Sequence, residues 1–128
     1  MSIQYRLTEK SDNINRSPKK GHFAQVITRG TIDTRELCKI ISSRCTLTPA
    51  DLKAAIDAIT ETIEEKLAEG YNVSLNEMGT FSITAETQEN ASAEDTLPTS
   101  RNVAFKKVNF RASVRLKKAL RNAHFEKL

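Results

Sequence analysis

A dense group of lysines and arginines near the end of this 128-residue chain is its most distinctive chemical feature. Residues 101–128 carry nine Lys or Arg and a single acid, Glu126. Arg115 and Lys118 are three positions apart, and Lys117 and Arg121 four, spacings that gather side chains on one side of a helix. Such side chains bind phosphates through charge and do not read base identity. The segment predicts a sequence-tolerant surface for a polyanion, the alternative being a solvated basic face.

The other reactive residue types form no catalytic or metal-binding pattern. Cys38 and Cys45 would stand about 10 Å apart on one continuous helix, so we expect two small core residues and no disulfide. His22 and His124 have no Cys or carboxylate at metal-ligand spacing, which argues against zinc. There is no nucleophile elbow, Gly-rich phosphate loop or HExxH motif. We therefore expect no enzyme activity, no catalytic residues, no metal and no cofactor.

A second charged segment has the opposite sign. Residues 82–100 contain no base and four acids, Glu86, Glu89, Glu94 and Asp95. Residues 85–100 hold almost nothing that could be buried, so a mobile projection or loop is expected there. This composition fits a solubilising loop, a DNA mimic that covers the protein's own basic surface, or a contact for a protein partner.

The overall composition is that of one globular domain, with 38% apolar and 28% charged residues and a net charge of +4. That small net charge conceals basic segments at residues 1–30 and 101–128 and an acidic middle, an asymmetry that indicates a polyanionic partner. No apolar run approaches the roughly 18 residues needed to cross a bilayer, and MSIQYRLTEK lacks the apolar stretch of a signal peptide. With only two cysteines, a cytoplasmic protein without membrane contact is expected.

Hydrophobic periodicity places these segments on an α+β framework. Period-two alternation predicts a β-hairpin from strands near residues 3–8 and 23–28. Two helices follow, the second capped by Thr48 with Pro49 at its first position and ended by Gly70. Strands near 71–75 and 80–84 flank a tight turn, and a strand from Val103 slips phase at Lys106-Lys107, as a β-bulge would. A short helix capped by Ser113 closes the chain.

In order and spacing, three stretches resemble one known family. They are LTPADLKAAIDAI at 47–59, EGYNVSLNEMGTFSI at 69–83 and VNFRASVRLKKAL at 108–120. Residues 32–120 thereby resemble the histone-like HU/IHF family of bacterial DNA-binding proteins. The N-terminal QYRLTEK and GHFAQVITRGT and the C-terminal LKKALRNAHFEKL are more similar to the extended HU-related proteins of Bacteroidetes.

The resemblance implies an HU/IHF-like α+β fold and an intertwined homodimer. Two N-terminal helices, a three-stranded sheet with an extended arm at about 84–102 and a C-terminal helix would form an HU-like DNA-binding domain over residues 32–128. Residues 1–31 would add an N-terminal β-hairpin. A β-saddle and two arms would hold double-stranded DNA with little sequence preference, as in a nucleoid-associated protein.

Site residues follow from the same resemblance. The turn ending in Gly79 and Thr80 matches the place where backbone amides and a hydroxyl approach phosphates. Lys106, Arg111 and Lys117 match positions that bear Lys or Arg. The full predicted DNA-binding set is Gly79, Thr80, Arg101, Lys106, Lys107, Arg111, Arg115, Lys117, Lys118 and Arg121.

The arm departs from the family pattern. Family arms are rich in Lys and Arg and often carry a wedging proline, whereas this arm is acidic, with Glu94 at the wedge position and Pro98 displaced. A carboxylate facing phosphates opposes binding. We therefore expect duplex DNA to be held by the saddle and the last helix more than by the arms. The alternative is an HU-fold interaction module whose acidic arms bind a protein partner, with weak or no DNA binding; an RNA-binding variant would share the basic surface.

Overall fold

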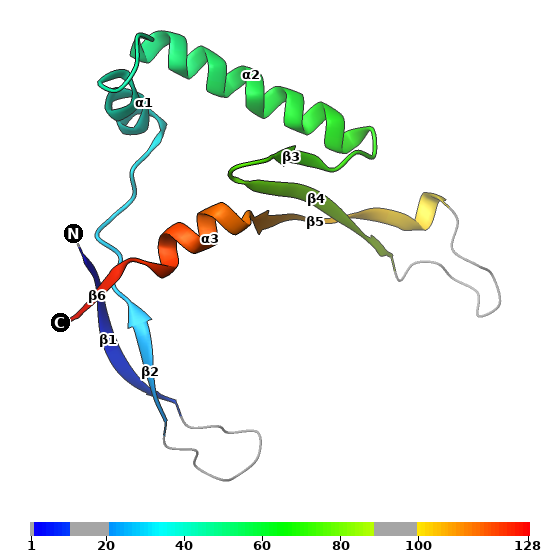
Figure 1. Ribbon diagram of the computed structural model, residues 1–128. Coiled ribbons are helices and arrows are strands. Elements are labelled where there is room, and N and C mark those ends of the chain that lie inside the picture. The colour runs from blue at the N-terminus through cyan, green and yellow to red at the C-terminus, as the bar shows by residue number, and fades with distance from the viewer. Residues whose placement is uncertain (1, 11–20, 89–99) are drawn as a thin grey trace.

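The computed structural model of the chain describes residues 2–10, 21–88 and 100–128 (Figure 1). In these ranges three α-helices and two three-stranded sheets follow one another in the order ββ–αα–βββ–αβ, with a short 3-10 helix, η1, at Ser100–Asn102 before the fifth strand. The predicted α+β class is therefore confirmed. None of the described helices is long and apolar enough to span a membrane.

The two central helices begin and end at residues suited to those positions. Helix α1 spans Thr34–Ser42, and its N-cap Asp33 accepts a hydrogen bond from the Glu36 backbone N–H. Helix α2 spans Pro49–Ala68 and starts at the predicted N-cap Thr48, which forms a capping box in which Thr48 and Asp51 satisfy each other's backbone N–H groups. These caps fix where both helices begin.

Helix α2 ends in a Schellman motif. The Gly70 N–H donates to the Leu67 carbonyl at 3.1 Å and the Tyr71 N–H to the Lys66 carbonyl at 3.0 Å. Gly70 has a φ of +96°, a conformation in which a Cβ would be strained. The turn directs the chain back under α2 into the central sheet (Figure 1).

The central sheet consists of β3 (Val73–Leu75), β4 (Gly79–Thr87) and β5 (Val103–Ala112), all antiparallel in the order β3-β4-β5. Thr84 pairs with Lys107 but Ala85 pairs with Phe105, so Lys106 is the extra residue of a bulge. The phase slip predicted at Lys106-Lys107 is thus confirmed.

A second sheet joins the two ends of the chain, in the order β2-β1-β6. The predicted hairpin is present as β1 (Ser2–Lys10) and β2 (Gly21–Val26). Strand β6 (His124–Lys127) follows helix α3 (Val114–Arg121) and pairs in parallel with β1. The expectation that a helix closes the chain was wrong, because a β-strand follows it.

Few side chains of the single described chain are buried. The buried apolar residues are Cys38, Leu52 and Leu67. Cys45 lies beyond α1 and is exposed, so its expected place in the core was wrong; both thiols are free. Large apolar side chains stay exposed on α2 and the central sheet, for example Ile59 at 46%, Phe105 at 60% and Phe110 at 48%. This chain alone leaves much of its potential core uncovered.

Candidate nucleic-acid interface

The central sheet has one apolar and one polar face. Val73 and Leu75 line a groove with Ile59 and Ile63 of α2, so their side of the sheet faces the helix. Cross-strand partners share a face, which adds Phe81, Ile83, Val108 and Phe110 to the apolar side. The opposite side, called the polar face below, carries Ser74, Thr80, Ser82, Thr84, Lys107, Asn109 and Arg111.

Hydrogen bonds order the small side chains of the polar face. The Thr80 hydroxyl donates to Ser74 Oγ at 3.3 Å, and the Asn109 amide donates to Thr84 Oγ1 at 2.5 Å. Lys107 pairs across the strands with Thr84, and Arg111 with Thr80. Each cation therefore lies beside a short polar side chain on the same face, which leaves the head group of the cation accessible. Sequence reasoning missed Ser74, Ser82, Thr84 and Asn109, whose signal was the alternation of short polar residues with large apolar ones.

The bulge separates the two adjacent lysines. Lys107 belongs to the polar face by register, whereas Lys106 has no cross-strand partner and is not assigned to that face. Both side chains are exposed. The structure thus supports Lys107 more directly than Lys106 as part of a common cationic surface.

Helix α3 continues the cationic surface. Its N-cap Ser113 accepts a hydrogen bond from the Leu116 N–H at 3.1 Å, as the sequence predicted. At 3.6 residues per turn, Leu116, Ala119 and Leu120 share one side of the helix. The opposite, basic side of α3 carries Arg115, Lys117, Lys118 and Arg121, all exposed.

A hollow of about 430 Å³ connects the polar face to α3. It is lined by Thr80 and Arg111 from the sheet and by Arg115 from the helix, together with Asn76 and Gly79. The turn between β3 and β4 is attached to the helix, because Ser113 donates from its hydroxyl to the Glu77 carbonyl at 2.7 Å and from its backbone N–H to the Met78 carbonyl at 2.9 Å. These contacts bring two predicted arginines and the Thr80 hydroxyl to one concave site.

Gly79 has a packing role at this site. A Cβ at residue 79 would lie 2.4 Å from the Arg111 carbonyl oxygen and 2.7 Å from the Phe110 ring. The ring could rotate, but the carbonyl belongs to the paired strand β5. The close approach of β4 to β5 therefore depends on a residue without a side chain.

We expect Gly79→Ala to destabilise the protein by roughly 1–3 kcal/mol, the usual cost of overpacking. Urea unfolding followed by circular dichroism measures this free energy. The control is Ala85→Gly at an exposed position farther along the same strand, which measures how much an exchange between Gly and Ala changes stability through strand propensity alone. Unchanged stability in Gly79→Ala would contradict the packing role.

Arg101 is not brought together with the other predicted residues. It lies in η1, ten residues before Arg111, which corresponds to about 33 Å along an extended strand. Glu86 is exposed and lies between them on β4, on the side of the sheet that carries Lys107. The acids Glu89, Glu94 and Asp95, the displaced Pro98 and the N-terminal bases Arg16, Lys19 and Lys20 lie outside the described residues.

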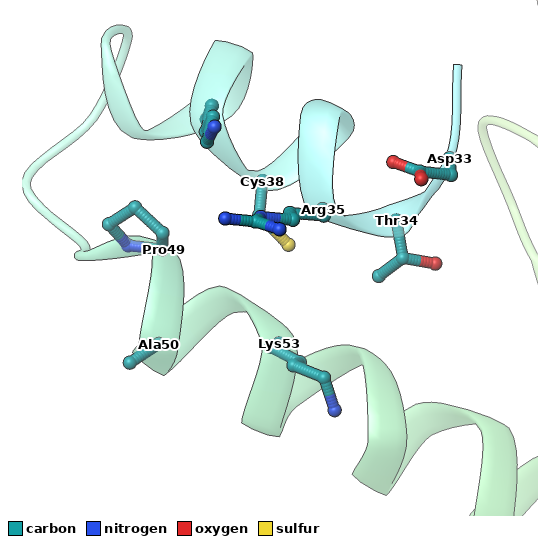
Figure 2. A pocket seen from close by; sticks show the side chains of 8 residues that line it. Asp33, Thr34, Arg35, Cys38, Pro49, Ala50 and Lys53 are labelled. Atoms are coloured by element: carbon teal, nitrogen blue, oxygen red, sulfur yellow. The ribbon is translucent and has the colours of Figure 1, made fainter.

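A second basic hollow, of about 530 Å³, lies between α1 and α2. Figure 2 shows Arg35, Lys53 and the buried Cys38 among the residues that line it. Lys39 also lines it, but Lys53 is paired with Asp57 at 3.2 Å. Counting ion pairs among the described residues alone, the hollow has fewer unpaired cations than the polar face and α3 together, so the latter form the stronger candidate interface.

Comparison with known proteins identifies related chains. Residues 1–127 match the family model HU-HIG, described as an HU domain fused to a wHTH, Ig or glycine-rich motif. No curated protein matches the sequence significantly. Among solved structures, the chain is similar to a "Putative bacterial DNA binding protein from Bacteroides vulgatus ATCC 8482", with a TM-score of 0.71 and 14% identity. That match covers 99% of this chain and 48% of the other, so this chain spans about half of its neighbour's length, and at this identity the likeness is one of fold.

Proposed function

This chain belongs to the HU-HIG family of HU domains, and from that premise we propose that it binds double-stranded DNA as a homodimer with little sequence preference. The observation that carries the proposal is the continuity of the polar face with the basic side of α3 through the hollow that Arg111 and Arg115 both line. Such a surface contacts phosphates along a duplex backbone. A role as a nucleoid-associated protein follows from this mode of binding.

The exposed apolar surface supports the homodimer. Ile59 on α2 and Ile83, Val108 and Phe110 on the apolar face of the sheet are all 45–52% exposed. The groove between α2 and the sheet has a volume of about 310 Å³ and is lined almost wholly by apolar groups. Exposed apolar side chains gathered on neighbouring elements are typical of an interface. A second copy would supply the missing half of the core.

The direct test of the proposed function is fluorescence anisotropy with a random-sequence duplex in a salt titration. If the homodimer contacts six to ten phosphates, its affinity falls roughly 10³- to 10⁵-fold between 50 and 200 mM salt. Scrambling the duplex sequence leaves the affinity unchanged, and a duplex RNA competitor measures preference for DNA. Absence of binding at 50 mM salt, or binding indifferent to salt, contradicts the proposal.

Glu86 favours a second candidate function for the arm. This carboxylate is exposed, pairs across the strands with Ala104 and has no salt bridge within the described part of the chain. Glu86 lies on the polar face, where DNA would bind, and its carboxylate repels the phosphates of the DNA backbone. An arm of this kind is suited to a basic protein partner. The same titration separates the two functions, because an interaction module gives weak or no binding to the duplex.

A further inference from the structure

An ion pair joins the turn between β3 and β4 to the first turn of α3. Glu77 Oε2 lies 2.8 Å from Arg115 Nη1, and the two side chains are 80% and 71% exposed. The Ser113 hydroxyl and backbone N–H hold the backbone of residues 77 and 78 against α3. The Glu77 carboxylate is therefore kept within reach of Arg115, and both groups remain accessible to solvent and to ligands.

Arg115 and Arg111 line the same hollow but differ in their partners. Arg111 has no salt bridge within the described residues, whereas the Arg115 guanidinium already holds a carboxylate. Carboxylate and phosphate oxygens bind a guanidinium in the same geometry. A phosphate that approaches the hollow must then compete with Glu77 for Arg115. The carboxylate also repels it.

We propose that Glu77 is an affinity-determining residue that occupies Arg115 in the free protein and limits how tightly the hollow binds a backbone phosphate. This inference rests on the proposed function. Because the pair is exposed, its own stability is small and a phosphate can displace it. The pair lowers affinity for DNA and reduces the number of counterions that binding releases. Glu77 thereby keeps the complex readily reversible.

The test is Glu77→Gln, which removes the charge and keeps the shape of the side chain. The backbone carbonyls that accept from Ser113 are unaffected by this change. A homodimer has two copies of Arg115, and releasing both from Glu77 raises affinity for a random duplex about tenfold at 50 mM salt. The slope of log affinity against log salt becomes steeper by about 1.8, since each added phosphate contact contributes about 0.9. Anisotropy titrations at several salt concentrations give both values.

The matched control is Glu69→Gln, which removes the same charge from another exposed ion pair. Glu69 lies at the end of α2 and pairs with Lys66 at 3.1 Å. Glu69→Gln changes affinity less than twofold if the effect of Glu77 is local. An equal gain in both variants would mean that net charge alone is responsible, and it overturns the proposal.

Arg115→Gln completes the cycle. This substitution leaves the Glu77 carboxylate unpaired and so weakens binding, and in the Glu77→Gln variant it removes the whole gain. A gain that persists in the double variant overturns the proposal, as does lower affinity in Glu77→Gln. Glu77→Ala repeats the measurement if Glu77→Gln does not fold. If neither wild type nor variant binds at 50 mM salt, the proposed function fails as well; if wild type binds with the same slope as Glu77→Gln, only this inference fails.

Discussion

Replacing Lys107 and Arg111 together by Ala weakens duplex DNA binding on the order of 10²- to 10³-fold at fixed salt. Both cations lie on the polar face, where register pairs them with Thr84 and Thr80. A homodimer loses two contacts in each subunit, and each solvent-exposed contact contributes about 0.7–1 kcal/mol. The loss is uniform across DNA sequences, because these side chains contact phosphates and not bases.

The salt dependence distinguishes this loss from misfolding. Removing four phosphate contacts from the dimer flattens the log–log slope by about 3.6. The matched control is Lys39→Ala with Lys53→Ala, which removes the same charge from the hollow between α1 and α2 (Figure 2). If that control lost more affinity than Lys107→Ala with Arg111→Ala, the helical hollow and not the sheet would be the DNA contact.

Ile59→Glu is expected to abolish the homodimer and lower the free energy of unfolding by roughly 3–5 kcal/mol. In one chain the Ile59 side chain is 46% exposed, so a carboxylate there would be tolerated by a stable monomer. At a dimer interface the same charge would be buried without a partner. A large loss of stability in Ile59→Glu therefore indicates that residue 59 is buried at a dimer interface, and a small loss indicates a monomer.

Light scattering after size-exclusion chromatography and urea unfolding measure the two consequences. Ala54→Glu introduces the same charge on the other side of α2 at an exposed position, and we expect it to change stability by less than about 0.5 kcal/mol. A monomeric wild type, or an Ile59→Glu protein as stable as the Ala54→Glu control, would contradict the homodimer.

Local signals made most of the fold predictable. The Thr48–Asp51 capping box, the glycine that ends α2 and the Ser113 cap are properties of a few adjacent residues, and each is present in the structure. Strand β6 was missed because its four residues show too little alternation to indicate a strand without a partner. That partner, β1, lies at the other end of the sequence and supplies the backbone hydrogen bonds.

The candidate site was less predictable than the elements that carry it. Residue type identified Lys106 and Lys107 alike, but only the register of β4 and β5 assigns Lys107 to the polar face. The Glu77–Arg115 pair depends on the attachment of a turn to a helix 36 residues later. Composition alone could not reveal that Arg115, one of the nine bases in residues 101–128, is already paired with a carboxylate.

The parallel pairing of β1 with β6 has a consequence for the order in which the chain folds. Ser2 is aligned with His124, and the Leu128 N–H donates to the Tyr5 carbonyl at 3.0 Å. During synthesis the β1–β2 hairpin can form early from local contacts, but its third strand, β6, is made only after helices α1 to α3 and the central sheet. Contacts of such long sequence separation slow folding. Until β6 is made, the edge of β1 that receives it remains open, and the nascent chain is then most exposed to pairing with a neighbouring copy.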